Sequence, residues 1–240
     1  MLKRGKKSVL PSHADKNKLA DDFVDFFSEK VQKIQDTFPP IDRAKIHEHS
    51  VENVPVLNCI EQVTEDELRK IISTTKSKSC NLDPIPTTLL KATIDPLLPT
   101  LCKIVNKSIE SNTFPDAFKT ATVTPILKKP SLSAENMSNY RPVSGLAYVG
   151  KLIEKIVVTS FNNHITRHDL DEKYQSAYRP FHSVETVKVF NDVLISLENG
   201  KGVMLVLLDL SAAFDTVDPN ILVERLENSF GITGSASEWT

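Results

Sequence analysis

A single aspartate at the end of an apolar segment is the residue of this chain best placed to do chemistry. Asp209 follows the run Val203 to Leu208, and Gly202 precedes that run. Because both alternating sets of side chains in the run are apolar, we predict a β-strand that is buried on both faces. A carboxylate beside a dry core is costly unless something uses it. The pattern therefore suggests an acid that binds a metal ion at the end of a central strand.

The reaction that such a carboxylate would serve is phosphoryl transfer with two divalent metal ions. That chemistry needs acids on adjacent strands, which hold the metal ions about 4 Å apart. Asp209 supplies half of such a set, and 22 residues follow Asp218 in this chain, so we expect the second carboxylate strand to be missing. The alternative interpretation is that Asp209 caps the turn after a buried strand, as aspartate often does.

Basic residues are concentrated in the middle of the chain, although the net charge is −2. Residues 119–155 carry six bases and two acids, whereas residues 202–240 carry one base and six acids. A site for phosphates beside metal-binding carboxylates would show this distribution, and so would chance grouping. The charge of the whole chain argues against a strong stand-alone nucleic-acid binder.

The composition is that of an ordinary soluble protein, with 40% hydrophobic and 25% charged residues. No apolar run approaches the roughly 18 residues of a membrane-spanning helix, and no apolar signal segment follows the basic residues 1–10. Three widely spaced cysteines without metal-binding spacing indicate a reduced, intracellular protein, nuclear or cytoplasmic. We therefore expect no membrane partner and no small-molecule cofactor.

In the first half of the chain the hydrophobic pattern predicts helices separated by a linker. Residues 1–12 are expected to be a disordered basic tail. Apolar residues at helical spacing predict a helix over residues 15–36, and the aperiodic, proline-bearing residues 39–60 predict a linker. A capping box at residues 64–67 predicts the start of the next helix. Further helices are expected over about residues 87–94 and 97–111, after a rigid turn at residues 81–86.

The second half combines a strand with helices, which favours an α+β fold over a doubly wound sheet. Residues 120–127 are rich in β-branched side chains and predict the strand. Apolar periodicity predicts a helix over residues 152–165. Two capped helices are also expected. The first starts at Ser183 and ends before Gly200, and its inward side chains are Val187, Phe190, Leu194 and Leu197. The second follows Asp218-Pro219 and runs from Ile221 to Phe230.

Several sequence blocks occur in an order that is typical of one family. They begin with LADDFVDFFSEKVQKI and TKSKSCNLDPIPTTLLK and continue with TPILKKP, NYRPVSGLAYVGKLIEKIV and YQSAYRPFHSVET. The last block, LLDLSAAFDTVD, contains Asp209. Together they resemble the reverse transcriptases of non-LTR (LINE-type) retrotransposons of the jockey kind. The resemblance covers about residues 15 to 240.

The resemblance implies a truncated right-hand polymerase that catalyses nucleotidyl transfer from dNTPs onto a DNA primer, with an RNA template and Mg²⁺. It divides the chain into a junction segment from the endonuclease side (residues 13–60), a helical N-terminal extension (residues 61–118) and part of the polymerase domain (residues 119–240). That part would comprise the fingers and the first palm strand.

Other motifs of the family are expected to be absent, namely the paired-aspartate hairpin, the primer grip and the thumb. None of the four tyrosines begins a Tyr-x-Asp-Asp sequence. We therefore expect a fragment that is inactive alone and binds Mg²⁺ weakly. The alternatives are an RNA-binding or interaction module derived from such a polymerase, and an unstable pseudogene product.

The resemblance also assigns roles to four residues around the predicted strand and the fingers. Asp209 matches the catalytic, metal-binding aspartate, and the Leu210 carbonyl is a further metal contact. Phe214 matches the aromatic residue that packs under the incoming sugar and rejects a 2′-hydroxyl, and its alternative role is in the core. Arg141 matches the arginine that clamps the triphosphate. The alternative is a surface arginine in a proline-rich turn.

Five further residues have weaker assignments from the same resemblance. Lys128 and Lys129 are assigned to phosphate or template backbone, or alternatively to a solvated turn. Gln175, Tyr178 and Arg179 match a block that lies near template and substrate. The family often has phenylalanine at the position of Tyr178, which weakens the assignment of this loop.

Three patterns that resemble functional sites receive plainer interpretations. Asp21 and Asp22 precede the first palm motif and belong to a solvated helix face. His164 and His168 have the i, i+4 spacing of a zinc site, but without a third ligand in sequence we interpret them as surface histidines. Asp215 is interpreted as a turn or cap residue.

Overall fold

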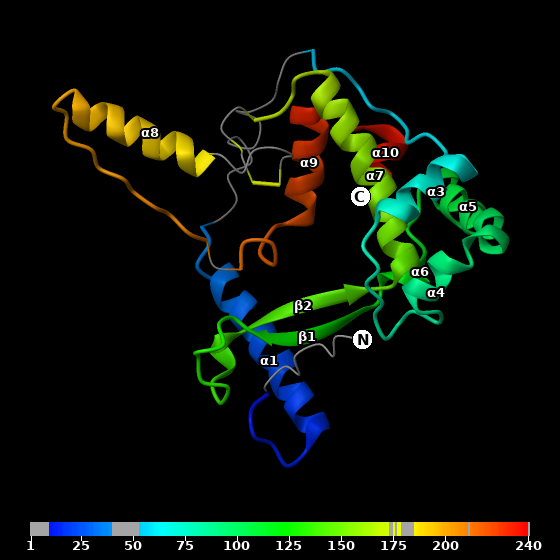
Figure 1. The fold of residues 1–240 in the computed structure, drawn as a ribbon, viewed down its shortest axis with the longest axis horizontal. Helices are drawn as coiled ribbons and strands as arrows, with labels where there is room; N and C mark the ends of the chain where they lie inside the picture. Colours follow the sequence, from blue (N-terminus) through cyan, green and yellow to red (C-terminus); the bar gives the residue numbers. More distant parts are fainter. Residues whose placement is uncertain are drawn as a thin grey trace.

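The computed structural model describes residues 10–39, 53–172, 175, 177–178, 185–210 and 212–239 of the chain. Within these residues, a group of helices is joined to a two-stranded antiparallel ribbon, which agrees with the predicted α+β class (Figure 1). The elements in chain order are α1 (Lys16–Gln35), α3 (Glu65–Thr74), α4 (Thr87–Ala92), α5 (Ile94–Glu110), α6 (Asp116–Lys119), β1 (Ala121–Leu127), the 3₁₀ turn Met137–Asn139, β2 (Tyr140–Leu146), α7 (Tyr148–Arg167), α8 (Glu185–Glu198), α9 (Pro219–Phe230) and α10 (Gly234–Glu238).

The hydrophobic core lies among α3, α5 and α7, on the right of Figure 1. Leu68 of α3, Val105 of α5 and Leu152 of α7 are completely buried there. Ile232 and Ala236, from the C-terminal end of the chain, are buried in the same cluster. Helices α3, α5 and α7 and the C-terminal end therefore share one core.

Two predicted helix starts are confirmed by their caps. At the start of α3, the Thr64 N–H donates to the Glu67 carboxylate at 2.8 Å, and the Glu67 N–H donates to the Thr64 hydroxyl at 3.3 Å. At the start of α9, the Asp218 carboxylate accepts from the Asn220 N–H at 2.8 Å, and Pro219 occupies the first helical position. Both signals act within a few residues, so they were readable from sequence.

The amphipathic helix α1 packs against one face of the β1–β2 ribbon. Phe23 of α1 meets Tyr140 of β2 edge to face, with ring centroids 5.1 Å apart, and Leu19 belongs to the same buried cluster. The Tyr140 hydroxyl donates to the Ala134 carbonyl at 2.9 Å, and burial raises the pKa of this hydroxyl. The helix predicted over residues 15–36 is confirmed, and its apolar side covers the ribbon.

Part of the predicted linker is docked on the C-terminal end of the chain. The Leu57 N–H donates to the Gly231 carbonyl at 2.9 Å, and the Thr233 N–H donates to the Leu57 carbonyl at 3.0 Å. Residues 53–60 contain no helix or strand, as expected for a linker, but the bridge at Leu57 fixes them to the C-terminal end of the chain. Residues 40–52 lie outside the described part of the chain.

The strand predicted over Val203 to Leu208 does not form in the structure. Residues 202–210 have no regular secondary structure and make no backbone hydrogen bond to any other described residue. The predicted burial is also wrong, since Leu208 is 91% exposed. A strand needs a neighbour to pair with, and the two strands of the described chain pair with each other.

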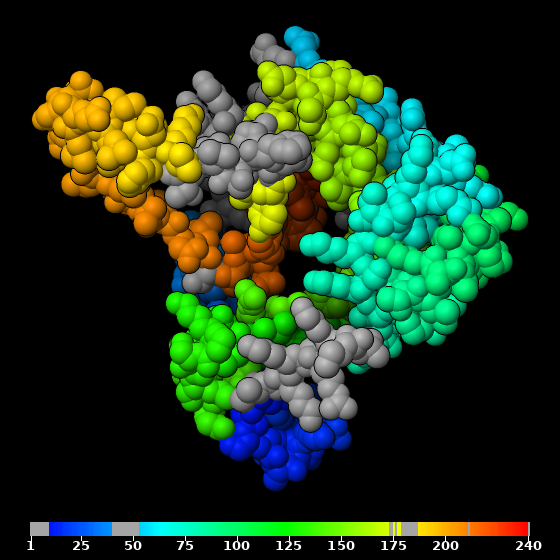
Figure 2. Space-filling model, viewed as in Figure 1, coloured from blue at the N-terminus to red at the C-terminus, as the bar shows by residue number. Residues whose placement is uncertain are grey.

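Helix α8 forms as predicted, but its apolar side is not buried. Val187, Phe190, Leu194 and Leu197 were expected to point inward and are exposed, Phe190 by 63%. The helix projects from the rest of the molecule (Figures 1 and 2), and no described element covers these four side chains. The proposed cap, Ser183, lies outside the described residues.

Helix α7 extends the predicted helix of residues 152–165 at its N-terminal end and buries one of the two histidines. His164, interpreted as a surface residue, is buried, and its Nε2 lies 2.9 Å from the Phe230 carbonyl of α9. The ring of His168 lies 4.9 Å from that of His164. His164 therefore joins α7 to the end of α9. No described helix has the length and apolar character needed to cross a membrane.

Candidate functional site

Arg141 lies in strand β2, opposite Ile126 of β1. Successive side chains of a strand point to opposite faces, so Arg141 lies on the face of the ribbon away from Tyr140 and α1. Its side chain is exposed. The interpretation of this segment as a proline-rich turn is wrong, and the guanidinium is presented from a regular strand on the open face of the ribbon.

The ribbon tolerates two prolines because they face each other at a position where no ladder bond is needed. Pro125 and Pro142 are directly opposite. The Lys128 N–H donates to the Asn139 carbonyl at 2.8 Å, which makes that pair a hydrogen-bonded one. Bonded and non-bonded pairs alternate, so the proline pair is non-bonded, and the N–H groups that proline lacks would point outward. The strand that carries Arg141 is therefore intact.

The two lysines after β1 have different surroundings. The Lys128 ammonium donates to the Ser138 carbonyl at 2.8 Å, within the connection between the strands. Lys129 is exposed. Of the pair, Lys128 therefore stabilises the turn that ends the ribbon, and Lys129 is the better candidate for contact with a phosphate.

The structure brings together two residues that were assigned separately. The rings of Tyr178 and Phe214 meet edge to face, with centroids 6.0 Å apart, and they are 88% and 77% exposed. The alternative role of Phe214 in the core is therefore wrong. Gln175 donates through Nε2 to the Ala177 carbonyl at 3.2 Å, and Arg179 lies outside the described residues.

Asp209 and Leu210 are both exposed on the unpaired segment before α9. In the described part of the chain, no group of three or more His, Cys, Asp or Glu side chains is placed to hold a metal ion. A two-metal site for phosphoryl transfer needs several carboxylates around the ions. The described residues therefore do not fit a two-metal site, and Asp209 offers a single carboxylate.

A hollow of about 410 Å³ places the residues after Asp209 beside α1 and β2. It is lined by Phe27 and Gln35 of α1, Pro142 of β2, Ala212 and Asp215. The Asp215 N–H donates to the Ala212 carbonyl at 3.0 Å, which confirms Asp215 as a turn residue. The turn thus lies on the α1 side of the ribbon, whereas Arg141 lies on the other face.

Asp83 fixes the junction between β2 and α7, a role that the sequence did not reveal. One carboxylate oxygen accepts from the Cys80 N–H at 2.7 Å, and the other accepts from the Tyr148 N–H, at the start of α7, at 2.6 Å. The Cys80 thiol donates to the Leu146 carbonyl, the last residue of β2, at 3.2 Å. The segment NLDPIP predicted a turn, but it gave no signal for a partner 65 residues away.

Replacing Asp83 with alanine is expected to lower the free energy of unfolding by about 2 kcal/mol, because two backbone N–H groups lose a charged acceptor. Asp83→Asn keeps one carbonyl oxygen and should cost less. Asp25→Ala, on the exposed side of α1, is the matched control and should change stability by less than about 0.5 kcal/mol. Urea denaturation followed by circular dichroism measures all three. Equal effects of Asp83→Ala and Asp25→Ala would contradict this role.

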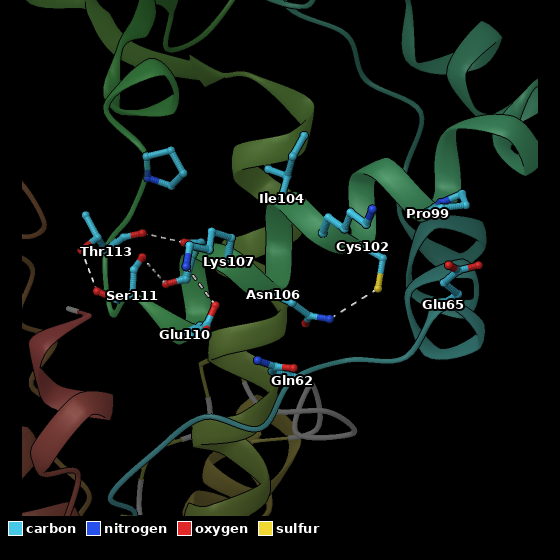
Figure 3. Close-up of a pocket in the computed structure, with 13 residues that line it drawn as sticks. Gln62, Glu65, Pro99, Cys102, Ile104, Asn106, Lys107, Glu110, Ser111 and Thr113 are labelled. Carbon is cyan, nitrogen blue, oxygen red and sulfur yellow. Dashed lines mark hydrogen bonds and ion pairs between the residues drawn. The ribbon is translucent and has the colours of Figure 1, made fainter.

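A second hollow, of about 860 Å³, runs along α5 and contains none of the predicted site residues (Figure 3). Cys102 lines it, and its thiol donates to the Val63 carbonyl at 3.3 Å. Burial, followed by the nearby Glu65 carboxylate, raises the pKa of this thiol. A thiol held in its neutral form is a poor nucleophile, so this hollow does not indicate a cysteine-dependent enzyme.

Comparison with known proteins shows which family the ribbon and the segments after it resemble. Residues 126–235 match the family described as reverse transcriptase (RNA-dependent DNA polymerase). This range contains every residue proposed above for the site, from Lys128 to Phe214. These residues therefore lie in the part of the chain that is similar to reverse transcriptases.

The similar proteins are RNA-directed DNA polymerases of a transposon and of a mobile element. The chain is 27% identical over 168 residues to the probable RNA-directed DNA polymerase from transposon BS of Drosophila melanogaster, and the match covers 69% of this chain and 18% of that protein. It is also 27% and 29% identical over 161 residues to the RNA-directed DNA polymerases from mobile element jockey of Drosophila melanogaster and Drosophila funebris, matches that cover 65% of this chain and 17% of each relative. These matches support a segment of a jockey-type reverse transcriptase, and they span less than a fifth of the length of these relatives.

Proposed function

We propose that this chain contributes the fingers and the first palm segment of an RNA-directed DNA polymerase, and that by itself it does not extend a primer. The observation that carries the second part is the state of Asp209, a single exposed carboxylate on a segment without pairing partners. A divalent metal ion, when bound in such polymerases, stabilises the charge of the transferring phosphoryl group. The described residues supply one carboxylate toward that role.

The residues on the ribbon could bind phosphates even though Asp209 is the one carboxylate available for a metal ion. Arg141 is always charged, exposed and held on a regular strand, so it is suited to bidentate contact with a phosphate. Lys129 adds a second cation at the end of β1. We assign the open face of the ribbon to the phosphates of the incoming nucleotide or of the template. Phe214 lies in the turn on the opposite, α1 side of the ribbon, so its assignment to the sugar requires the turn and the ribbon to be rearranged in the complete polymerase.

Primer extension tests this proposal. The 240-residue chain is incubated with an RNA template, an annealed DNA primer, dNTPs and Mg²⁺, and Asp209→Asn is the matched variant. We expect no extension above that of the variant. Robust cDNA synthesis by the natural chain that disappears in Asp209→Asn would overturn the proposed inactivity.

A second candidate function is binding of single-stranded RNA, which the exposed pair of Tyr178 and Phe214 favours. Stacking of a base on an aromatic ring contributes about 1–3 kcal/mol. Tyr178→Ala and Phe214→Ala should therefore each weaken binding to a single-stranded RNA at least about fivefold in fluorescence anisotropy. Phe38→Ala, an exposed aromatic residue at the end of α1, is the control and should leave affinity unchanged. Equal losses in all three variants would contradict a specific stacking site.

The same binding assay separates phosphate contacts from stacking. When a cation that contacts a phosphate is removed, about one fewer counterion is released on binding, so the slope of log affinity against log salt becomes less steep by about one. Arg141→Gln should therefore flatten the plot of log affinity against log salt, whereas Phe214→Ala should lower affinity without changing the slope. An unchanged slope for Arg141→Gln would contradict the assignment of the ribbon face.

A further inference from the structure

The segment from Val203 to Leu210 is apolar except at Asp209, and it is exposed and unpaired. Its members range from 42% exposure at Val203 to 91% at Leu208. Within the described residues, nothing forms backbone hydrogen bonds with positions 202–210. An exposed apolar segment with free N–H and C=O groups is a template for pairing with another strand.

The segment projects where a second chain has access to it. Helix α8 ends with Gly200 in the left-handed region, at φ 69°, and the Lys201 N–H donates to the Ser196 carbonyl at 3.0 Å. After this helix end the chain turns back and returns past α8 toward the rest of the molecule (Figure 1). Figure 2 shows α8 and the residues after it projecting from the body of the molecule.

We propose that this segment pairs antiparallel with the same segment of a second copy of the chain, about a two-fold axis at Leu205. In this register Lys201 of each copy lies opposite Asp209 of the other, and Val203 lies opposite Leu207. Opposite charges that face each other across strands stabilise the pair. Moving the axis to residue 206 would place Asp209 opposite Val203, so the charge pattern selects the register centred on Leu205.

The exposed apolar side of α8 gives this interface enough surface. Val187, Phe190, Leu194 and Leu197 have the spacing of one helical face and are all exposed. Together with the seven apolar residues of the segment, each copy offers eleven exposed apolar side chains. At about 60–120 Å² for a fully buried side chain, the exposed apolar side chains of two copies offer roughly 1,300–2,600 Å², which reaches the size of a specific interface.

Sedimentation equilibrium of the full chain, with charge-reversed variants, tests the pairing. We expect a monomer–dimer equilibrium. Lys201→Asp and Asp209→Lys each place two like-charged pairs in the dimer, so each should raise the dissociation constant about tenfold or more. The double variant restores opposite charges and should recover the natural constant. This recovery would not occur if either substitution acted by disturbing the fold.

Disulfide formation tests the register independently of charge. Directly opposed residues of an antiparallel pair have Cα atoms about 4.5–5.5 Å apart, which is within disulfide range. In a Cys59→Ser background, which removes an exposed native thiol, Leu205→Cys should form a covalent dimer on mild oxidation. Val203→Cys is the matched control, because its two thiols would lie about 13 Å apart along the strands.

Three results would overturn the proposal. They are a chain that stays monomeric at all concentrations, a double charge reversal that does not recover the dimer, and a Val203→Cys variant that cross-links as well as Leu205→Cys. A chain that is monomeric alone but binds the remainder of a jockey-type polymerase through this segment would show that the segment takes a strand from a different protein. That result would also overturn pairing between copies.

Discussion

Replacing Gly231 with alanine is expected to lower the free energy of unfolding by about 2–5 kcal/mol. Gly231 has φ 66°, a conformation that costs other residues about 1–2 kcal/mol. A Cβ at this position would lie 2.1 Å from the Pro55 carbonyl oxygen, and relieving that overlap adds about 1–3 kcal/mol. The substitution should therefore separate residues 54–58 from the C-terminal end of the chain.

Gly200→Ala provides a matched control for this prediction. Gly200 has φ 69°, and a Cβ there would meet no atom within 4 Å. It carries the conformational cost without the overlap, so it should destabilise by only about 1–2 kcal/mol. Chemical denaturation followed by circular dichroism measures both variants. If the two substitutions lowered the free energy of unfolding equally, the close approach of Gly231 to Pro55 would not hold residues 54–58 against the C-terminal end.

Truncating Leu152 to alanine is expected to cost about 3–4 kcal/mol. Leu152 is completely buried at the centre of the contact among α3, α5 and α7, and a buried leucine loses transfer free energy and leaves a cavity when it is truncated. Val158→Ala, at an exposed position of the same helix, is the control. It should be within about 0.5 kcal/mol of the natural chain.

The same denaturation experiment decides between the shared core and a separate N-terminal half. If the core is shared, Leu152→Ala should shift a single transition. A variant that loses one half of the signal while the other half unfolds at its natural midpoint would contradict a core that includes Ile232 and Ala236.

Helix boundaries were predictable from sequence because their signals are local. Thr64 and Glu67 are three residues apart, and Asp218 and Pro219 are adjacent. Each pair satisfies the free N–H groups of its own helix start without help from the rest of the chain. The sequence was therefore sufficient to predict that helices α1, α3, α5, α7, α8 and α9 exist.

Pairing between distant segments was much less predictable. The strand β2 was missed because Pro142 and Arg141 interrupt an apolar alternation, and only the register with β1 shows that Pro142 needs no N–H. The run from Val203 to Leu208 has strong strand character but no pairing partner in the described chain. An apolar pattern reports what a segment would bury, and it does not report whether a neighbour is present.

The site itself was predictable in its residue types but not in its arrangement. Asp209, Arg141 and Phe214 were identified from blocks in family order, and the match over residues 126–235 supports that origin. The contact between Tyr178 and Phe214 and the carboxylate bonds of Asp83 depend on the fold, so no local pattern indicated them. The roles of the individual site residues stay predictions.

The most direct measurement is primer extension by a chimera in which residues 126–235 replace the matched region of the transposon BS polymerase. We expect RNA-templated cDNA synthesis that falls at least about 100-fold with Asp209→Asn, the effect of losing several kcal/mol of transition-state stabilisation. Asp215→Asn, in the neighbouring turn, should retain activity within a few-fold. A chimera without cDNA synthesis, or one whose synthesis survives Asp209→Asn, would contradict the account of this chain as a polymerase segment built around Asp209.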